Sequence, residues 1–354
     1  MKRIVMINTG GTFSSARGEN GLSPKLTGTQ IRNFLGEFEE DLELSTEDYC
    51  ALDSSNITPE DWVQLADKIS QIIHSCDGVV IIHGTDTMAY TASMLSFMLQ
   101  NLPIPVVLTG SQLPIGVPMS DAVNNCRCAV QMAASGLGGV YVAFDHKLML
   151  GCRTSKVRTV SFNAFESINY PYVGEVNALG MQLYPTHLSK PTGEFQLQTA
   201  YSDKIAVLKL FPGMRPDLFF PFSRKKAMKE SISKVLDWEA SPLSKNDITE
   251  EISKASKAGI PILVGSQCSY EGSNLGVYET GLRVLESGGI PVHDMTQEAI
   301  VTKLMWCLGQ TKDREKIHQL FHTNLIQEEL FPTKLCFHIC AALRTDAAAQ
   351  PWSI

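Results

Sequence analysis

The chain has 354 residues, of which 44% are hydrophobic and 19% are charged, a composition typical of a globular protein long enough for two domains. Its formal net charge of −7 argues against a nucleic-acid-binding surface. No stretch reaches the roughly 18–20 apolar residues that a membrane-spanning helix needs, and the apolar run at the N-terminus is too short for a signal peptide.

Short apolar runs alternate with helical patterns in the first half of the chain. This alternation predicts strands and then helices in turn, the strands at 4–7, 78–82, 105–108 and 139–144 and the helices at 29–38, 59–75, 87–100 and 120–135. The helix from residue 59 has clear start signals, because Thr58 precedes Pro59 and two acidic residues follow. The series predicts an α/β fold with a larger N-terminal domain at 1–185, built on a doubly wound, mostly parallel sheet.

The pattern changes near residue 183, where Pro, Thr, Ser and Gln follow one another without periodicity. We interpret 186–200 as a linker between domains. A smaller C-terminal α/β domain is predicted at 201–335, with strands at 205–210 and 261–265, helices at 250–258 and 299–308, and a tail at 336–354.

Nine cysteines occur without a Cys-x-x-Cys pair or any framework spacing. This usage indicates reduced thiols and therefore a cytoplasmic protein. Cys126 and Cys128 have no histidine nearby in the sequence, so no metal site is expected there.

Four polar groups are placed to meet at one edge of the predicted sheet. They are Thr9-Gly10-Gly11-Thr12 after the first strand, Asp53-Ser54-Ser55-Asn56, Thr85-Asp86 after the strand at 78–82, and Arg153-Thr154-Ser155-Lys156 beyond the strand at 139–144. The carboxyl ends of parallel strands share an edge, and ligands bind there in open α/β sheets. Taken singly, each group also fits an ordinary turn, a polar loop before a helix or a solvated charge.

Together the four groups predict chemistry with a hydroxyl nucleophile. A threonine would attack a carbonyl, a lysine oriented by an aspartate would act as base, and glycine N–H groups would stabilise the oxyanion. A nucleotide-dependent dehydrogenase is disfavoured, because the glycine spacing at 9–12 matches neither the dinucleotide fingerprint nor the phosphate-binding loop.

With TGGT at 9–12, DSS at 53–55, HGTDTM at 83–88, TGSQ at 109–112 and Lys156, the chain resembles the bacterial L-asparaginase family, and most of all its type I, cytoplasmic branch. The resemblance covers residues 1 to about 214 and about 247 to 330. It implies hydrolysis of L-asparagine to L-aspartate and ammonia, without a metal or cofactor, by a homodimer or homotetramer. The alternatives are a glutaminase-asparaginase, the asparaginase-like subunit of a tRNA amidotransferase, and an amino-acid-binding homologue without turnover.

The resemblance also implies a role for each motif residue. Thr12 would be the nucleophile that forms an acyl-enzyme, and Gly11 would help to form the oxyanion hole. Thr85, Asp86 and Lys156 would form a second triad in which Lys156 lies beside Thr85 and Asp86 binds the α-amino group of the substrate.

The same resemblance assigns Ser54 and Ser55 to the α-carboxylate of the substrate. The sequence departs from the family pattern at Leu22, where better-known members carry a tyrosine that assists the nucleophile from a mobile loop. We therefore expect a lid that closes over the site without supplying a phenol.

A second departure lies at about 222–246, where the family pattern predicts a buried strand and a glycine-rich loop. The sequence there is charged, helix-like and nearly free of glycine. Either a lineage-specific segment replaces the family sequence or a compensated shift of reading frame produced it. We favour the frameshift, and the tail at 336–354 would share its origin. Loss of this strand would threaten the stability of the second domain and its subunit contacts.

Overall fold

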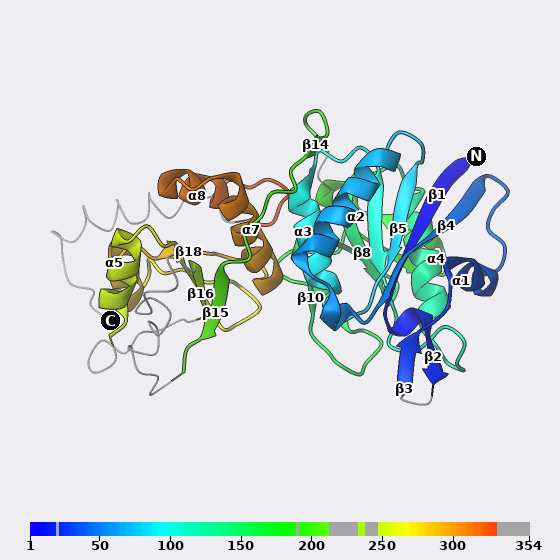
Figure 1. The fold of residues 1–354 in the computed structure, drawn as a ribbon, viewed down its shortest axis with the longest axis horizontal. Coiled ribbons are helices and arrows are strands. Elements are labelled where there is room, and N and C mark those ends of the chain that lie inside the picture. The colour runs from blue at the N-terminus through cyan, green and yellow to red at the C-terminus, as the bar shows by residue number, and fades with distance from the viewer. Residues whose placement is uncertain (19–20, 189–190, 212–232, 238–246, 331–354) are drawn as a thin grey trace. The chain divides into compact units, whose positions relative to one another are not determined.

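The computed structural model describes residues 1–18, 21–188, 191–211, 233–237 and 247–330 (Figure 1). The chain divides into two units. Unit 1 consists of Met1–Tyr201, Thr296–Trp306 and Leu325–Glu328, and unit 2 consists of Ser202–Met295, Cys307–Asn324 and the residues from Glu329 on. Unit 1 is thus discontinuous in sequence. Within the described residues, no helix is both long and apolar enough to cross a membrane.

Unit 1 is built on an eight-stranded sheet, in the order β13-β12-β9-β8-β7-β5-β1-β4. The parallel part contains β4 (Leu42–Leu52), β1 (Lys2–Gly10), β5 (Gly78–Ile82), β7 (Pro105–Thr109) and β8 (Gly139–Phe144). The antiparallel extension contains β9 (Lys147–Leu150), β12 (Gly174–Asn177) and β13 (Gly180–Leu183). The predicted fold class, a larger mostly parallel α/β domain followed by a smaller one, is confirmed.

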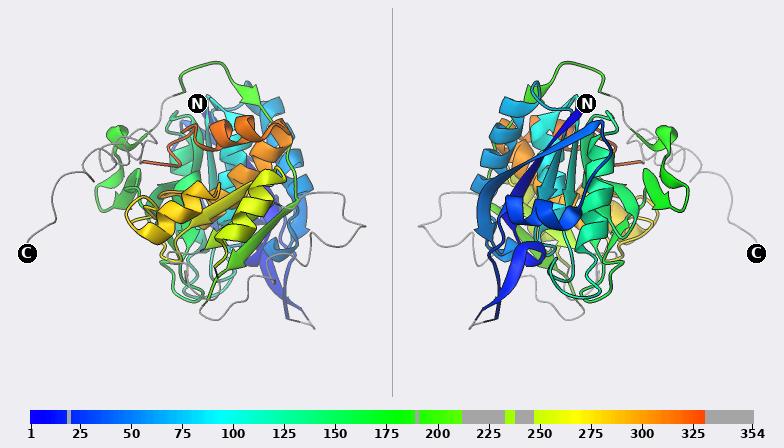
Figure 2. Two further views of the ribbon diagram at one scale, coloured as in Figure 1. Left: turned by 90° about the vertical axis from the view of Figure 1, so that its left-hand side faces the viewer. Right: turned by 90° about the vertical axis from the view of Figure 1, so that its right-hand side faces the viewer.

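Helices cover both faces of this sheet (Figures 1 and 2). Helix α1 (Gly28–Leu35) packs with α4 (Ala122–Ala133), and α2 (Pro59–Ile72) packs with α3 (Met88–Met98). Every residue of the apolar strand β5 is consequently buried. The helix and strand predictions in this unit are confirmed with small shifts at their ends.

Several further elements of unit 1 were not predicted. Strand β4 is a half-exposed edge strand rich in acidic and hydroxyl residues, so it lacks a continuous apolar run. The others are short: β2 (Ser15–Gly18) with β3 (Gly21–Pro24), β6 (Leu99–Gln100) with β14 (Gln196–Leu197), and β10 (Thr154–Lys156) with β11 (Phe165–Ser167).

Unit 2 contains a four-stranded parallel sheet, in the order β15-β16-β17-β18. Its strands are β15 (Ile205–Lys209), β16 (Ser233–Asp237), β17 (Ile262–Gly265) and β18 (Ile290–Pro291). Helices α5 (Thr249–Lys257), α6 (Glu279–Glu286) and α8 (Arg314–Phe321) belong to this unit, and α7 (Gln297–Gln310) contributes its residues up to Trp306 to unit 1. Helices α6 and α8 were not predicted.

The atypical segment at 222–246 lies mostly outside the described residues, as does the tail at 336–354. Within it, Ser233–Asp237 forms β16, which pairs in parallel with both β15 and β17. The helix-like interpretation is therefore wrong for these five residues. A strand position between two parallel strands outweighs the local helix propensity of a short charged segment.

Candidate active site

The loop after β1 carries the first predicted group. Thr9 Oγ1 donates a hydrogen bond to the carbonyl of Ile82 at 2.8 Å, which joins the ends of β1 and β5. Gly10 and Gly11 then adopt φ values of 104° and 78°, a left-handed region that glycine enters without strain. Thr12 follows at the start of a short 3-10 turn and is partly exposed. This turn presents the Thr12 side chain at the carboxyl end of the strand.

The loops that contain Gly11, Ser54 and Gly84 pack closely against one another. A Cβ added to Gly11 would lie 2.4 Å from Cα of Gly84, and one added to Gly84 would lie 2.6 Å from Cβ of Ser54. Thr87 Oγ1 also donates to the carbonyl of Ser54 at 2.8 Å. The loops after β1, β4 and β5 therefore pack so closely that only glycine fits at the two central positions.

Ser54 and Ser55 lie in the loop after β4, in a short 3-10 turn. Ser54 is buried, whereas Ser55 is exposed and donates from its hydroxyl to Asp53 Oδ1 at 2.7 Å. The backbone N–H of Ser55 and then this hydroxyl lower the pKa of Asp53, which keeps its carboxylate ionised. Binding of a second carboxylate by the Ser55 hydroxyl therefore requires that hydroxyl to rotate away from Asp53.

Thr85, Asp86 and Lys156 form one cluster. The ammonium of Lys156 donates to Thr85 Oγ1 at 2.8 Å and to Asp86 Oδ1 at 2.6 Å. The side chain of Lys156 is 15% exposed, and that of Asp86 is 68% exposed. Lys156 reaches this position from β10, far from the other two in sequence. One cation thus joins a hydroxyl that is buried to a carboxylate that remains open to solvent.

A buried histidine that sequence reasoning left without a role supports the loop at Gly84. Burial lowers the pKa of His83 to about 4, so the imidazole is neutral. Its Nδ1 lies 2.7 Å from the carbonyl of Gly84, and its Nε2 lies 2.9 Å from Thr91 Oγ1. Because a carbonyl only accepts, Nδ1 carries the proton and Nε2 accepts from Thr91, which in turn accepts from Trp62 Nε1 at 2.9 Å. This series of hydrogen bonds holds the carbonyl group of Gly84 in place.

Strand β10, which carries Lys156, is held by residues from much later in the chain. Ser155 Oγ donates to Glu298 Oε1 at 2.8 Å, and Arg153 Nε donates to the carbonyl of Gln327 at 2.7 Å. Burial raises the pKa of Glu298, which favours its neutral form. Sequence reasoning missed Glu298 as a support of this strand, although an acidic residue directly before the predicted apolar helix at 299–308 was the available signal.

All the predicted site residues belong to unit 1, and the structure brings most of them into contact. Gly11 and Ser54 approach through Gly84, and Thr85, Asp86 and Lys156 contact one another directly. Thr12 and Thr85 are the residues that follow the two touching glycines. A partly exposed threonine hydroxyl, a second hydroxyl bonded to a lysine and an open carboxylate at one sheet edge are suited to acyl transfer from an amide.

Comparison with known proteins gives matches over both units. The family model "Asparaginase, N-terminal" matches residues 3–188, and "Glutaminase/Asparaginase C-terminal domain" matches residues 204–321. The L-asparaginase of Thermococcus kodakarensis is 40% identical over 330 residues, which are 92% of this chain and 98% of the relative. A solved structure of the thermostable L-asparaginase from that organism has a TM-score of 0.86 at 38% identity and covers 93% of this chain and 99% of its own.

Two further relatives carry different names. L-asparaginase 1 of Escherichia coli is 36% identical over 337 residues, which are 94% of this chain and 98% of the relative. A glutamyl-tRNA(Gln) amidotransferase subunit of Pyrococcus abyssi is 32% identical over 340 residues, which are 93% of this chain and 77% of the relative.

Proposed function

Since this chain belongs to the L-asparaginase family, we propose that it hydrolyses L-asparagine to L-aspartate and ammonia through an acyl-enzyme on Thr12. The observation that carries the proposal is the contact of Lys156 Nζ with both Thr85 and Asp86, beside the loop that presents Thr12. The 40% identity to an L-asparaginase over nearly the whole of that relative favours the same substrate.

In this mechanism the Thr12 hydroxyl attacks the side-chain amide carbon of asparagine. A C–O bond forms, the hydroxyl proton moves toward the Thr85 and Lys156 pair, and the oxyanion accepts hydrogen bonds from backbone N–H groups at Gly11 and its neighbours. The C–N bond then breaks, and the leaving nitrogen takes the proton and departs as ammonia. Water attacks the ester by the reverse route and releases L-aspartate and the free hydroxyl of Thr12.

Substrate orientation follows from charge. The Asp86 carboxylate, on a side chain that is 68% exposed, would hold the α-ammonium. Ser54 and Ser55 would hold the α-carboxylate after the Ser55 hydroxyl leaves Asp53. Leu22 lies in β3, the second strand of the hairpin that follows Thr12. We propose that this hairpin closes over the substrate and that the proton path needs no phenol at this position.

The test measures ammonia release from L-asparagine and L-glutamine by the full chain over a range of concentrations. Thr12→Ala should reduce turnover to background, and Lys156→Met should lower kcat by about 10²–10⁴-fold, the usual contribution of a positioned acid–base group. The matched controls are Thr29→Ala on the exposed surface of α1 and Lys68→Met, whose ion pair with Glu47 is partly exposed. Both controls should keep wild-type turnover.

The results separate the alternatives. Wild-type turnover in Thr12→Ala would refute the nucleophile. Binding of L-asparagine without ammonia release by the unmodified chain would indicate an amino-acid-binding homologue. Equal turnover of both amides would favour a glutaminase-asparaginase. The similarity to the amidotransferase relative supports one further candidate function, that of an ammonia-supplying component of a larger enzyme. In that case the unmodified chain alone would release little ammonia from either amide.

We also propose that the active protein is a homodimer or homotetramer, as the family resemblance implies. Light scattering coupled to gel filtration measures the mass directly, and a single species near the 38.9 kDa of one chain would contradict this proposal.

A further inference from the structure

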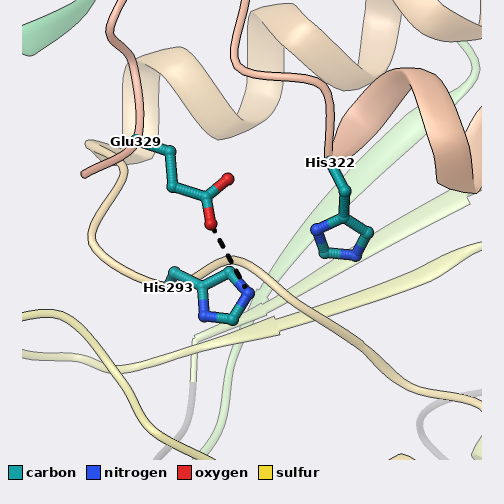
Figure 3. A group of neighbouring side chains, drawn as sticks. All are labelled: His293, His322 and Glu329. Atoms are coloured by element: carbon teal, nitrogen blue, oxygen red, sulfur yellow. Dashed lines mark ion pairs between the residues drawn. The ribbon is translucent and has the colours of Figure 1, made fainter. Parts of the chain in front are cut away.

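Three side chains of the types that bind metal ions face one another in unit 2 (Figure 3). His293 lies in the turn after β18, His322 lies at the C-terminal end of α8, and Glu329 lies in the segment that follows. One ligand atom from each residue lies within 4.8 Å of the others, and His293 Nε2 lies 3.5 Å from Glu329 Oε1. Three separate segments of the unit therefore converge on one point.

The spacing fits a metal ion better than a hydrogen bond. Ligand atoms bound to zinc at about 2.1 Å in a tetrahedral arrangement lie about 3.4 Å apart. The 3.5 Å between His293 and Glu329 matches this value and exceeds the usual length of a hydrogen bond. No hydrogen bond reaches His293 Nε2 from any described residue. A small movement of His322 would bring its nitrogen to the same distance.

The side chains of His293 and Glu329 are both buried. His293 is 6% exposed and Glu329 is 3% exposed. A neutral imidazole offers a lone pair to a metal ion, and the Nε2 atom of His293 faces Glu329. A divalent cation would bind both this imidazole and the buried carboxylate, and its charge would offset that of the carboxylate.

The backbone around the ligands is held in place. His293 has a φ of 51°, in the left-handed region, and its carbonyl accepts from the N–H of Ser273 at 3.0 Å. The carbonyl of Glu329 accepts from Asn324 Nδ2 at 2.6 Å, and the N–H of Leu330 donates to Asp294 Oδ1 at 3.0 Å. Strained residues held by their surroundings in this way cluster at ligand sites.

We propose that His293, His322 and Glu329 form a binding site for a divalent transition-metal ion, of which zinc suits two imidazoles and one carboxylate best. Magnesium and calcium are disfavoured, because they prefer sets of oxygen ligands. The ion would join the end of α8 and the segment at Glu329 to the turn after β18, and water would occupy the remaining position. The site lies apart from the catalytic cluster in sequence and needs no role in the hydrolysis.

The experiment uses the full, untagged chain after treatment with a chelator and dialysis. The Cys268→Ser/Cys336→Ser/Cys340→Ser background removes an exposed thiol and the two cysteines that flank His338 in the sequence, all of which would compete for zinc. Calorimetric titration with zinc should give one site per chain, and zinc should raise the melting temperature. The variants His293→Ala, His322→Ala and Glu329→Gln should each weaken zinc binding by at least about tenfold, the lower bound seen even for indirect partners of metal ligands.

Two controls keep the result clear. His318→Ala removes a histidine whose ring lies 4.5 Å from that of His322, and His74→Ala removes a histidine on unit 1. Both should keep the wild-type affinity. Glu329→Gln preserves size and should fold even if the histidine variants do not. X-ray absorption at the zinc edge should show two imidazoles and no sulfur. An unchanged affinity in Glu329→Gln, sulfur in the zinc shell, or no stoichiometric binding would overturn the proposal.

Discussion

The buried ion pair between Lys303 and Glu328 offers a sharp test of what holds unit 1 together. Both side chains are 0% exposed, and Nζ lies 2.5 Å from Oε1. The Glu328 carboxylate also accepts from the N–H groups of Leu325 at 3.1 Å and Ile326 at 2.8 Å. The pair therefore fixes the segment 325–328. In this segment the carbonyl of Gln327 accepts a hydrogen bond from Arg153, which directly precedes the strand that carries Lys156.

The two single substitutions should differ in cost. Breaking a buried pair costs about 3–5 kcal/mol, because it leaves an uncompensated charge. In Lys303→Met two backbone N–H groups still stabilise the carboxylate, so we expect about 3 kcal/mol, roughly a hundredfold in the unfolding equilibrium. In Glu328→Leu the ammonium of Lys303, 6.0 Å from the centre of the Phe97 ring, loses this carboxylate, and the N–H groups of Leu325 and Ile326 lose the same acceptor. We therefore expect the free energy of unfolding to fall by about 5 kcal/mol or more.

Urea unfolding followed by tryptophan fluorescence measures these changes, in a Trp238→Phe/Trp352→Phe background that leaves Trp62 and Trp306 of unit 1 as the emitters. The double variant Lys303→Met/Glu328→Gln removes both charges and keeps an acceptor for the backbone. Its free energy of unfolding should lie within about 1–2 kcal/mol of the wild-type value, although each single substitution lowers that free energy by more. A double variant as unstable as the sum of Lys303→Met and Glu328→Gln, each measured singly, would refute the reasoning.

Two further predictions concern the loops of the catalytic cluster. Because the pKa of His83 falls from 6.5 to about 4 on folding, the unfolded chain binds more protons between these pH values. The neutral His83 contributes about 3 kcal/mol to the free energy of unfolding above pH 6.5, and this contribution is lost as the pH falls toward 4. His83→Gln should therefore flatten this part of a curve of stability against pH. An unchanged slope in the variant would contradict the prediction. Gly84→Ala should lower kcat/KM for L-asparagine by about a hundredfold, because the added Cβ would displace Ser54. The control Gly116→Ala, whose added Cβ would have its nearest contact at 3.8 Å, should keep the wild-type kcat/KM. Equal activities of the two variants would show that the loops tolerate the displacement.

The parallel core of unit 1 was predictable because buried parallel strands carry continuous apolar runs. The five residues of β5 illustrate this, since all of them are buried. Strand β4 escaped prediction for the complementary reason, because an edge strand exposes one side and accepts acidic residues. Its position mattered, since it delivers Ser54 to the loop after β1.

For the candidate site, the motifs identified residues that the structure brings together, but not how they interact. Sequence order cannot show that the Ser55 hydroxyl is engaged by Asp53, or that His83 supports Gly84. Glu298 was missed for the same reason, because periodicity places a residue on a helix face without naming its partner. The side-chain partners of a residue depend on the tertiary fold, so they became visible only there.

The discontinuity of unit 1 has a consequence for how the protein is made. By the time Lys156 has left the ribosome, every residue of the candidate site has been synthesised. The partners that hold the strand of Lys156 emerge later, Glu298 after 202–295 of unit 2 and the segment 325–328 after 307–324 as well. Domains usually fold as units during synthesis, from the N-terminus onward. Unit 1 is therefore complete only after residue 328 has been synthesised. A chain that ends before Glu328 lacks the carboxylate that pairs with the buried Lys303, so its unit 1 should be less stable than that of the full chain.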